Sequence, residues 1–312
     1  MNIKKLCKIN FVFLLLFFVL FLTACDYQEA SKHAEPTQHT LSHMVDDERP
    51  LCVLAKREVL ILMYHDFRPE AVYGNDAIIS VETFRNQIYT LYNAGFETIT
   101  FDELIAFVDY GKPLPEKPII ITIDDGYRSN LEFAAPILYE FGMRAIINVI
   151  GISRGRDTYR NTDIPIIPHF TWDEVRPWVE LGVIQIGHHS YDMHRWHRNP
   201  YESWRYGVLP TEYETELGHR QALEYDFKKL YNIIYEELGI SSIVFAYPYG
   251  HYSPQTESIL QELGVRVTLT THSTTAIVEY GNPASLFLLG RVNMSEYTNF
   301  DTLFAMLDLH AS

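Results

Sequence analysis

Two adjacent carboxylates, Asp124 and Asp125, follow the apolar run Ile119–Ile123 in the segment PIIITIDDGY. Two like charges side by side repel, but a divalent cation bound by one of them would keep both ionised. Asp125 could then be the metal ligand while Asp124 takes a proton from water. Asp-Asp-Gly is also a common turn sequence, so this pair alone has a structural explanation.

Histidines supply the other groups that a metal site needs. The segment HHSYDMH (188–194) follows the apolar stretch Gly182–Gly187. Together with Asp125, His189 and His194 would give one carboxylate and two imidazoles, the ligand number and type of an open catalytic zinc site. Residues five apart lie about 140° apart around a helix, so these two histidines must converge through a loop.

The elements that would position these groups are alternating apolar strands and helical patterns, typical of a parallel sheet covered on both faces, as a barrel or a doubly wound sheet. In such folds the functional groups lie at the carboxyl ends of the strands. The predicted strands are Val59–Tyr64, Phe96–Thr100, Ile119–Ile123, Ala145–Ile150, Gly182–Gly187, Ser242–Tyr247, Val265–Thr270 and Leu286–Gly290. Helices are predicted at 80–94 with Ser80 as N-cap, from 102, and at 130–141, 172–181, 214–238 and 254–263.

The first 24 residues have the layout of a secretory signal peptide, with lysines before the unbroken apolar run Phe11–Leu22. This run is short for a spanning helix of about 20 residues, and LTAC (22–25) resembles the lipobox at which bacterial lipoproteins are cleaved. Cys25 would then carry the lipid; an uncleaved membrane anchor is the alternative. Either way the rest of the chain lies outside the cytoplasm, beginning with a polar, flexible tether over residues 25–57.

The net charge excludes some classes of binding partner, and the cysteine content excludes stabilisation by a disulfide. The formal net charge is −15, which argues against nucleic acid and anionic lipid surfaces as partners. After Cys25 only Cys52 remains, so the mature chain cannot form an intrachain disulfide. Its stability must come from a packed core. Nothing in the sequence indicates a protein partner or an oligomeric state.

The motifs resemble a known family. TIDDGY and HSYDMH are similar to the first two signature motifs of the polysaccharide deacetylases, the NodB-homology group or carbohydrate esterase family 4. LMYH (62–65), AGFETIT (94–100) and FAYPYG (245–250) are similar to the branch that deacetylates poly-β-1,6-N-acetylglucosamine. The resemblance covers about residues 58–291. It implies an α/β fold, a distorted (β/α) barrel of the NodB-homology type, with a single catalytic domain over residues 58–312.

Residue by residue, the resemblance implies a metal triad of Asp125, His189 and His194 and a catalytic base at Asp124. It also implies a main-chain N–H near Tyr249 that holds an oxyanion. The family's usual general acid is a histidine in a late LxH motif, which is absent around Leu286–Arg291. In the branch that deacetylates poly-β-1,6-N-acetylglucosamine, the histidine after the first strand takes this role. This indicates His65 as the general acid, with His310 as the alternative.

Some positions depart from the family pattern. Ala246 stands where many members have an arginine that orients the base, and Arg291 at the end of the last predicted strand is a candidate replacement. His188 could be an alternative ligand, but Ser190 fixes the family register on His189. Substrate contacts are expected from Tyr127, Tyr191 and Tyr247, because aromatic rings stack on sugar faces. Arg291 is expected to contact the substrate as well.

The sequence therefore predicts a metal-dependent hydrolase that removes N-acetyl groups from an N-acetylhexosamine polymer outside the cytoplasm. The ligands suit Zn²⁺, with Co²⁺, Ni²⁺ or Fe²⁺ also compatible. Poly-N-acetylglucosamine, peptidoglycan and chitin remain open as substrates, as does esterase action on acetylated xylan. A non-catalytic envelope lipoprotein that binds carbohydrate is a further alternative. A serine hydrolase is disfavoured, because there is no GxSxG motif.

Overall fold

Parallel β-strands form the scaffold of the structure, a computed structural model that describes residues 56–195 and 205–308. Within these residues the main sheet has the order β10-β1-β5-β6-β7-β8-β9, with β11 paired to β1 and β4 to β5. Every pairing is parallel except that of β1 with β10. The strands are β1 (Lys56–Tyr64), β4 (Glu97–Thr98), β5 (Pro118–Asp125), β6 (Ala145–Val149), β7 (Ile184–His188), β8 (Val244–Ala246), β9 (Val267–Leu269), β10 (Ala276–Glu279) and β11 (Val292–Asn293).

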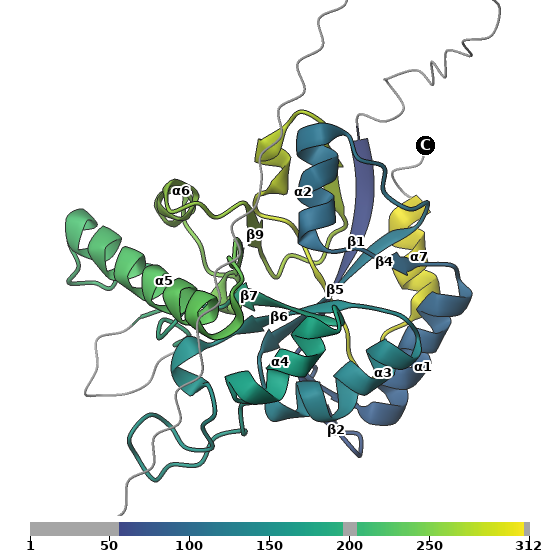
Figure 1. The fold of residues 1–312 in the computed structure, drawn as a ribbon, viewed down its shortest axis with the longest axis horizontal. Helices are drawn as coiled ribbons and strands as arrows, with labels where there is room; N and C mark the ends of the chain where they lie inside the picture. The colour runs from purple at the N-terminus through teal and green to yellow at the C-terminus, as the bar shows by residue number, and fades with distance from the viewer. Residues whose placement is uncertain (1–55, 196–204, 309–312) are drawn as a thin grey trace, which may run out of the picture. The chain divides into compact units, whose positions relative to one another are not determined.

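Helices cover the outer face of this sheet. The strands are apolar throughout because side chains on both of their faces are buried. Ile119, Ile121 and Ile123 of β5 pack outward against helices, whereas Ile120 packs inward in a second core cluster. Figure 1 shows α1, α3 and α4 next to one another along the sheet. The helices are α1 (Val81–Asn93), α2 (Phe101–Tyr110), α3 (Ala135–Glu140), α4 (Trp172–Glu180), α5 (Glu216–Leu238), α6 (Pro254–Glu262) and α7 (Phe300–Asp308).

The segment 289–293 joins the two ends of the curled sheet. Leu289 forms a parallel bridge with Leu269 of β9, and three residues later β11 pairs with Leu62 and Met63 of β1. Arg291 lies between these two attachments. Its side chain is fully buried on the inner side, where it donates hydrogen bonds to Thr270 O and Thr122 Oγ1.

Side-chain caps begin several helices, and the predicted cap Ser80 is one of them. Ser80 accepts a hydrogen bond from the Thr83 N–H at the start of α1, and Thr215 does the same for Gly218 at the start of α5. A short parallel pair, β2 (Asp66–Arg68) and β3 (Ile78–Ser80), lies between β1 and α1 in the chain. The predicted helix at 130–141 begins as a π-helical turn at Asn130–Ala134 before α3.

The predicted strand Leu286–Gly290 is wrong. Its first residue ends a 3-10 helix (Pro283–Leu286), and Leu288 has a φ of 57°, which no extended strand accommodates. The segment is apolar because Leu286 and Leu289 pack into the inner core cluster. Two elements are not among the predicted ones: β10, which pairs antiparallel with β1, and α7, which lies beyond the region covered by the motifs.

Several sequence-based predictions concern the two ends of the chain. Strand β1 begins at Lys56, two residues before the predicted domain start at 58. The predicted signal peptide, Cys25 and His310 lie outside the described residues. Among the helices of residues 56–195 and 205–308, none is both long and apolar enough to span a membrane.

Candidate active site

Asp124 and Asp125 end strand β5, and the backbone at Asp125 brings both carboxylates to the same rim. In a regular strand adjacent side chains point to opposite faces, so Asp124 would point inward and Asp125 outward. Asp125 instead has a φ of 72°, a left-handed conformation that aspartate tolerates better than most residues. The alternation breaks there. As a result, Asp124 Oδ2 and Asp125 Oδ1 both lie within 4 Å of His189 Nε2, at 3.9 and 3.7 Å.

Arg154 holds the turn that follows. Its Nη2 donates to the main-chain oxygens of Asp125 and Gly126 at 2.8 and 2.7 Å, and its Nε donates to Ile150 O at 3.2 Å. Gly126 has a φ of 76°, and a Cβ at this position would lie 2.5 Å from the Arg154 guanidinium. The glycine of the DDG motif is therefore needed both for its backbone conformation and for the approach of this arginine.

Asp124 is buried and held by a cation. Both oxygens accept hydrogen bonds from Arg291, Oδ1 from Nη1 and Oδ2 from Nη2, each at 2.8 Å. Asn148 Nδ2 of β6 donates to Oδ1 at 2.8 Å. Burial alone would raise the pKa of Asp124, but the charge of Arg291, with a smaller effect of His189, holds the pKa well below its usual range. Asp124 is therefore an oriented, ionised carboxylate.

Strand alternation also separates the two adjacent histidines after Gly187. His188, the last residue of β7, points outward and stacks on Phe227 of α5, with Nε2 against Phe227 O at 3.1 Å. His189 points inward, and its Nδ1 lies 2.7 Å from Ala246 O. Because a carbonyl only accepts, Nδ1 of His189 carries the proton and the Nε2 lone pair faces the carboxylates. His188 therefore does not join the site.

The loop 190–194 brings His194 back to the same point. Ser190 has a φ of 69°, and Asp226 of α5 accepts hydrogen bonds from the N–H groups of Tyr191 and Asp192, both at 2.7 Å. Burial raises the pKa of Asp226 to about 6. His194 Nε2 then lies 3.3 Å from Asp125 Oδ1, and its Nδ1 is 3.1 Å from the Tyr249 hydroxyl.

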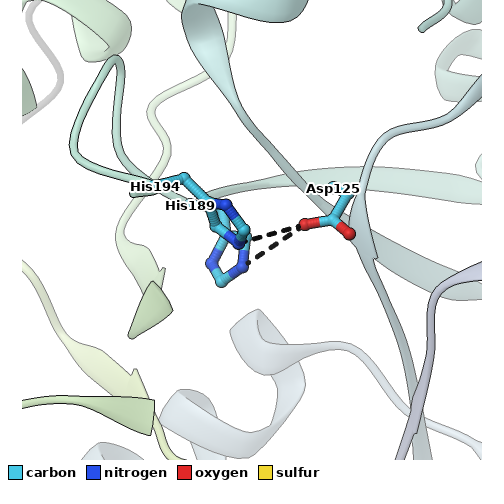
Figure 2. A group of neighbouring side chains, drawn as sticks. All are labelled: Asp125, His189 and His194. Carbon is cyan, nitrogen blue, oxygen red and sulfur yellow. Dashed lines mark ion pairs between the residues drawn. The ribbon is translucent and has the colours of Figure 1, made fainter. Parts of the chain in front are cut away.

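Asp125, His189 and His194 each offer one ligand atom, and these atoms all lie within 4.8 Å of one another. Figure 2 shows both imidazoles directed at the Asp125 carboxylate. Asp125 Oδ1 is buried yet makes no hydrogen bond with the described residues, as a carboxylate oxygen reserved for a cation would. Burial lowers the pKa of His194 to about 4, so its imidazole is neutral at neutral pH. These three side chains fit a divalent metal with nitrogen and oxygen ligands.

His65 lies close to the two carboxylates, as expected of the residue after β1. A positive charge on its ring would lower the pKa of both Asp124 and Asp125. Its main-chain oxygen accepts a hydrogen bond from Asn130 Nδ2 at 2.7 Å, which fixes the backbone. Its Nδ1 is buried and has no hydrogen-bond partner among residues 56–195 and 205–308.

The tyrosines predicted to contact substrate lie in different environments. Tyr127 lines a pocket next to His194, together with Tyr249. Tyr191 is half-buried, with Lys229 Nζ of α5 4.1 Å from its ring, and does not line this pocket. Tyr247 is fully buried on the outer side of β8, where its hydroxyl donates to Glu257 of α6 at 2.7 Å. The structure thus corrects the placement of Tyr247, because outward alternation removes its ring from the rim.

Two further residues differ from what the sequence predicts for the site. Arg291 has no exposed surface and binds Asp124, so the structure places it behind the base and not on a substrate-facing surface. His169 lines the pocket beside Tyr127, at a ring-centroid distance of 4.9 Å, and sequence reasoning missed it. It stands alone in a long loop, so no spacing pattern signals it.

Comparisons with known proteins agree with this geometry. Residues 111–268 match the profile of the family described as polysaccharide deacetylase. The chain is 26% identical over 235 residues to YxkH of Bacillus subtilis, whose name assigns it to the polysaccharide deacetylases; the match covers 75% of this chain and 71% of that protein. It is 23% identical to the poly-β-1,6-N-acetyl-D-glucosamine N-deacetylase of Escherichia coli, over 85% of this chain but only 40% of that protein.

Solved structures show the same fold. A de-N-acetylase from Aggregatibacter actinomycetemcomitans superposes with a TM-score of 0.69 at 21% identity, covering 80% of this chain and all of that one. IcaB from Ammonifex degensii gives 0.62 at 25% identity, covering 76% and 92%. The curled, mostly parallel sheet is thus the distorted barrel that the sequence predicts. By its sequence profile and its fold, this chain belongs to the polysaccharide deacetylase family.

Proposed function

We propose that this protein is a divalent-metal-dependent hydrolase that removes N-acetyl groups from a polymer of N-acetylglucosamine outside the cytoplasm. The observation that carries the proposal is the joint position of Asp124 and the triad Asp125, His189 and His194 at one rim. Relatives named as poly-β-1,6-N-acetyl-D-glucosamine N-deacetylases support the choice of polymer.

Asp125, His189 and His194 would hold the metal, which supplies a Lewis acid that activates water and polarises the acetyl carbonyl. Each histidine can present Nε2, because Ala246 O and the Tyr249 hydroxyl lie at the two Nδ1 atoms. The ligand types favour Zn²⁺, and Co²⁺, Ni²⁺ and Fe²⁺ are compatible.

Asp124 accepts a proton from the attacking water. Arg291 and Asn148 bind its carboxylate, which keeps it ionised and fixed in orientation. The base is therefore in position before the water attacks. The N–H near Tyr249 donates to the oxygen that becomes negative when the carbonyl is attacked. His65 gives a proton to the departing nitrogen as the C–N bond breaks. The products are acetate and a glucosamine unit.

Extracytoplasmic action rests on the sequence of residues 1–25. The signal-peptide layout and the LTAC stretch support export, with lipid attachment at Cys25 as the anchor to the membrane. Growth with a radiolabelled fatty acid tests this directly. Label should enter the wild-type protein and be absent from Cys25→Ser, and label in the Cys25→Ser variant would contradict the assignment.

Acetate release from β-1,6-linked and β-1,4-linked N-acetylglucosamine oligomers tests the activity and the polymer together. The purified protein with added Zn²⁺ should release acetate from the β-1,6 oligomer, and EDTA should stop the release. Release from the β-1,4 oligomer alone would redirect the assignment to chitin or cell-wall glycan. No release from either oligomer by metal-loaded protein would contradict the proposal and favour a carbohydrate-binding role.

A further inference from the structure

The loop between the two candidate histidine ligands has every main-chain group from Ser190 to Met193 hydrogen-bonded. In chain order, its N–H groups donate to His188 Nδ1, Asp226 Oδ1, Asp226 Oδ2 and Ser190 Oγ, at distances between 2.7 and 3.1 Å. Its carbonyls accept from Gly151 N, Ile152 N, Arg195 Nε and Arg195 N. Surface loops usually leave some of these groups to water, so complete pairing within the protein indicates a loop held in one conformation.

Asp226 is the partner that binds two of these groups. It lies on the buried face of α5, is 4% exposed, and accepts from the N–H groups of Tyr191 and Asp192 with one oxygen each. Its pKa of about 6 leaves the carboxylate ionised above neutral pH. Hydrogen bonds to an ionised acceptor are stronger than neutral ones, so Asp226 is a firm anchor for the middle of the loop.

His188 makes a second link between the loop and α5. Its Nε2 lies 3.1 Å from Phe227 O, and its Nδ1 accepts from the Ser190 N–H at 3.0 Å. Because a carbonyl only accepts and an N–H only donates, the ring carries its proton on Nε2 and bridges the helix and the loop. The rings of Phe227 and Phe245 stack on it, with centroids at 4.7 and 5.1 Å.

The opposite side of the loop packs on the segment that follows β6. The N–H groups of Gly151 and Ile152 donate to Ser190 O and Tyr191 O at 3.0 and 2.8 Å. A Cβ at Gly151 would lie 2.6 Å from the Tyr191 ring and 3.1 Å from its Cα, so glycine is needed for this approach. The loop is therefore held from two sides, by this segment and by α5.

These contacts bear on His194 more than on His189. The Nδ1 of His189 lies against Ala246 O of β8, outside the loop. The ring of His194 contacts groups of the site itself, namely Asp125, His189 and Tyr249. Both rings approach the Asp125 carboxylate from the same side (Figure 2). The main chain of residues 190–193 therefore determines where His194 stands before a metal binds.

We propose that Asp226 is a positioning residue for the metal site, which with the help of His188 anchors residues 190–193 to α5 and keeps His194 in place for the metal. The inference rests on the proposed function, which includes the metal site. A ligand that is already in place loses little conformational entropy when the metal binds, so the anchor should raise metal affinity. Asp226 thus acts on the metal without being one of its ligands.

Metal affinity and amide exchange of the full chain test this role together, at pH 8, where Asp226 is ionised. Asp226→Asn keeps one acceptor oxygen and should weaken Zn²⁺ binding about tenfold in competition with a chelating dye. Asp226→Leu keeps none and should weaken it about a hundredfold. In the metal-free proteins, a peptide spanning residues 188–195 should exchange its amide hydrogens faster in both variants than in wild type, and fastest in Asp226→Leu.

Two further variants separate positioning from general damage. Glu257→Gln is a matched control, because Glu257 is a buried carboxylate of α6 that binds the hydroxyls of Tyr247 and Thr268. It should lower the unfolding free energy but leave Zn²⁺ affinity and exchange of the 188–195 peptide unchanged. His188→Phe keeps a stacked ring but removes both hydrogen bonds, so it should weaken Zn²⁺ binding and speed the exchange.

Wild-type Zn²⁺ affinity in Asp226→Leu, or an equal loss of affinity in Glu257→Gln, would overturn the positioning role. So would faster exchange in the Asp226 variants without a change in Zn²⁺ affinity. Acetate release by the wild type is measured separately. Weak Zn²⁺ binding by the Asp226 variants supports the positioning role even if the metal-loaded wild type releases no acetate, a result that would contradict only the proposed function. A wild type that binds no Zn²⁺ would overturn both.

Discussion

Arg291 binds both oxygens of Asp124 at 2.8 Å, and the two side chains are almost completely buried. The position that supplies this arginine follows from the way the sheet closes, because residues 289–293 bridge β9 and β1. The family resemblance places an orienting arginine at position 246, where this chain has the uncharged Ala246. Arg291 provides a cation for Asp124 from the segment that directly precedes β11.

Replacing Arg291 should therefore damage both stability and activity. Arg291→Met leaves Asp124 as an uncompensated buried charge, which costs about 3–5 kcal/mol of unfolding free energy. It also raises the pKa of Asp124, so the acid limb of the pH–rate profile should move to higher pH. Arg266→Met is a control, because Arg266 also binds both oxygens of one carboxylate, through Nη2 to Asp109, but is 37% exposed. That variant should cost about 1 kcal/mol or less. Equal losses in urea unfolding of the two variants would contradict the account.

Asp226 predicts a stability change between about pH 4 and pH 6. Its pKa is raised to about 6 in the folded protein, so the folded state binds its proton more tightly than the unfolded state. The stabilisation linked to this proton is present below the unfolded pKa and is lost as the pH rises through 6. The unfolding free energy of wild type relative to Asp226→Asn should fall by roughly 3 kcal/mol over this range. A constant difference from pH 4 to pH 7 in chemical denaturation would exclude the shifted pKa.

Metal binding should stabilise the folded chain. The unpaired Asp125 Oδ1 gains a partner, and a metal at roughly 100 times its Kd adds about 2.7 kcal/mol. Thermal unfolding with Zn²⁺ added to EDTA-treated protein should show a higher Tm for wild type and little change for Asp125→Ala. The gain should shrink at low pH, because protonated imidazoles cannot bind metal. An identical rise in both proteins would place the metal elsewhere.

Tyr249 should contribute to metal affinity through His194. Its hydroxyl lies 3.1 Å from His194 Nδ1, and partners of this kind orient a ligand ring and raise its basicity. Tyr249→Phe should weaken Zn²⁺ binding about tenfold or more in equilibrium competition with a chelating dye. Tyr159→Phe removes a hydroxyl from the same pocket and should leave the affinity unchanged. If both variants bind Zn²⁺ as wild type does, the Tyr249 hydroxyl has no role in the site.

The sequence predicted much of the site because the fold obeys strand alternation. Consecutive strand ends share one rim, so the residues after β1, β5 and β7 could be grouped before their positions were known. Alternation also explains what failed at Tyr247, which points outward from β8. His169 could not be found in this way, because its position depends on a long loop whose backbone is set by tertiary contacts.

The final strands were harder to predict for a related reason. The LFLLG segment is apolar because two of its leucines fill the core, and not because it is extended. Strand β10 is short and alternates between buried and exposed residues, so its apolar signal is weak. Only the paired structure shows that residues 289–293 close the sheet, and with it why Arg291 reaches Asp124.

The assignment of Asp124 as the base is tested most directly by one comparison of wild type with Asp124→Asn. Acetate release from the β-1,6-linked N-acetylglucosamine oligomer and bound Zn²⁺ per chain are measured on the same samples. The account predicts that Asp124→Asn keeps its metal, because the triad is intact, while its rate falls by about 10²–10⁴. A variant that still releases acetate near the wild-type rate with metal bound would show that Asp124 is not the base.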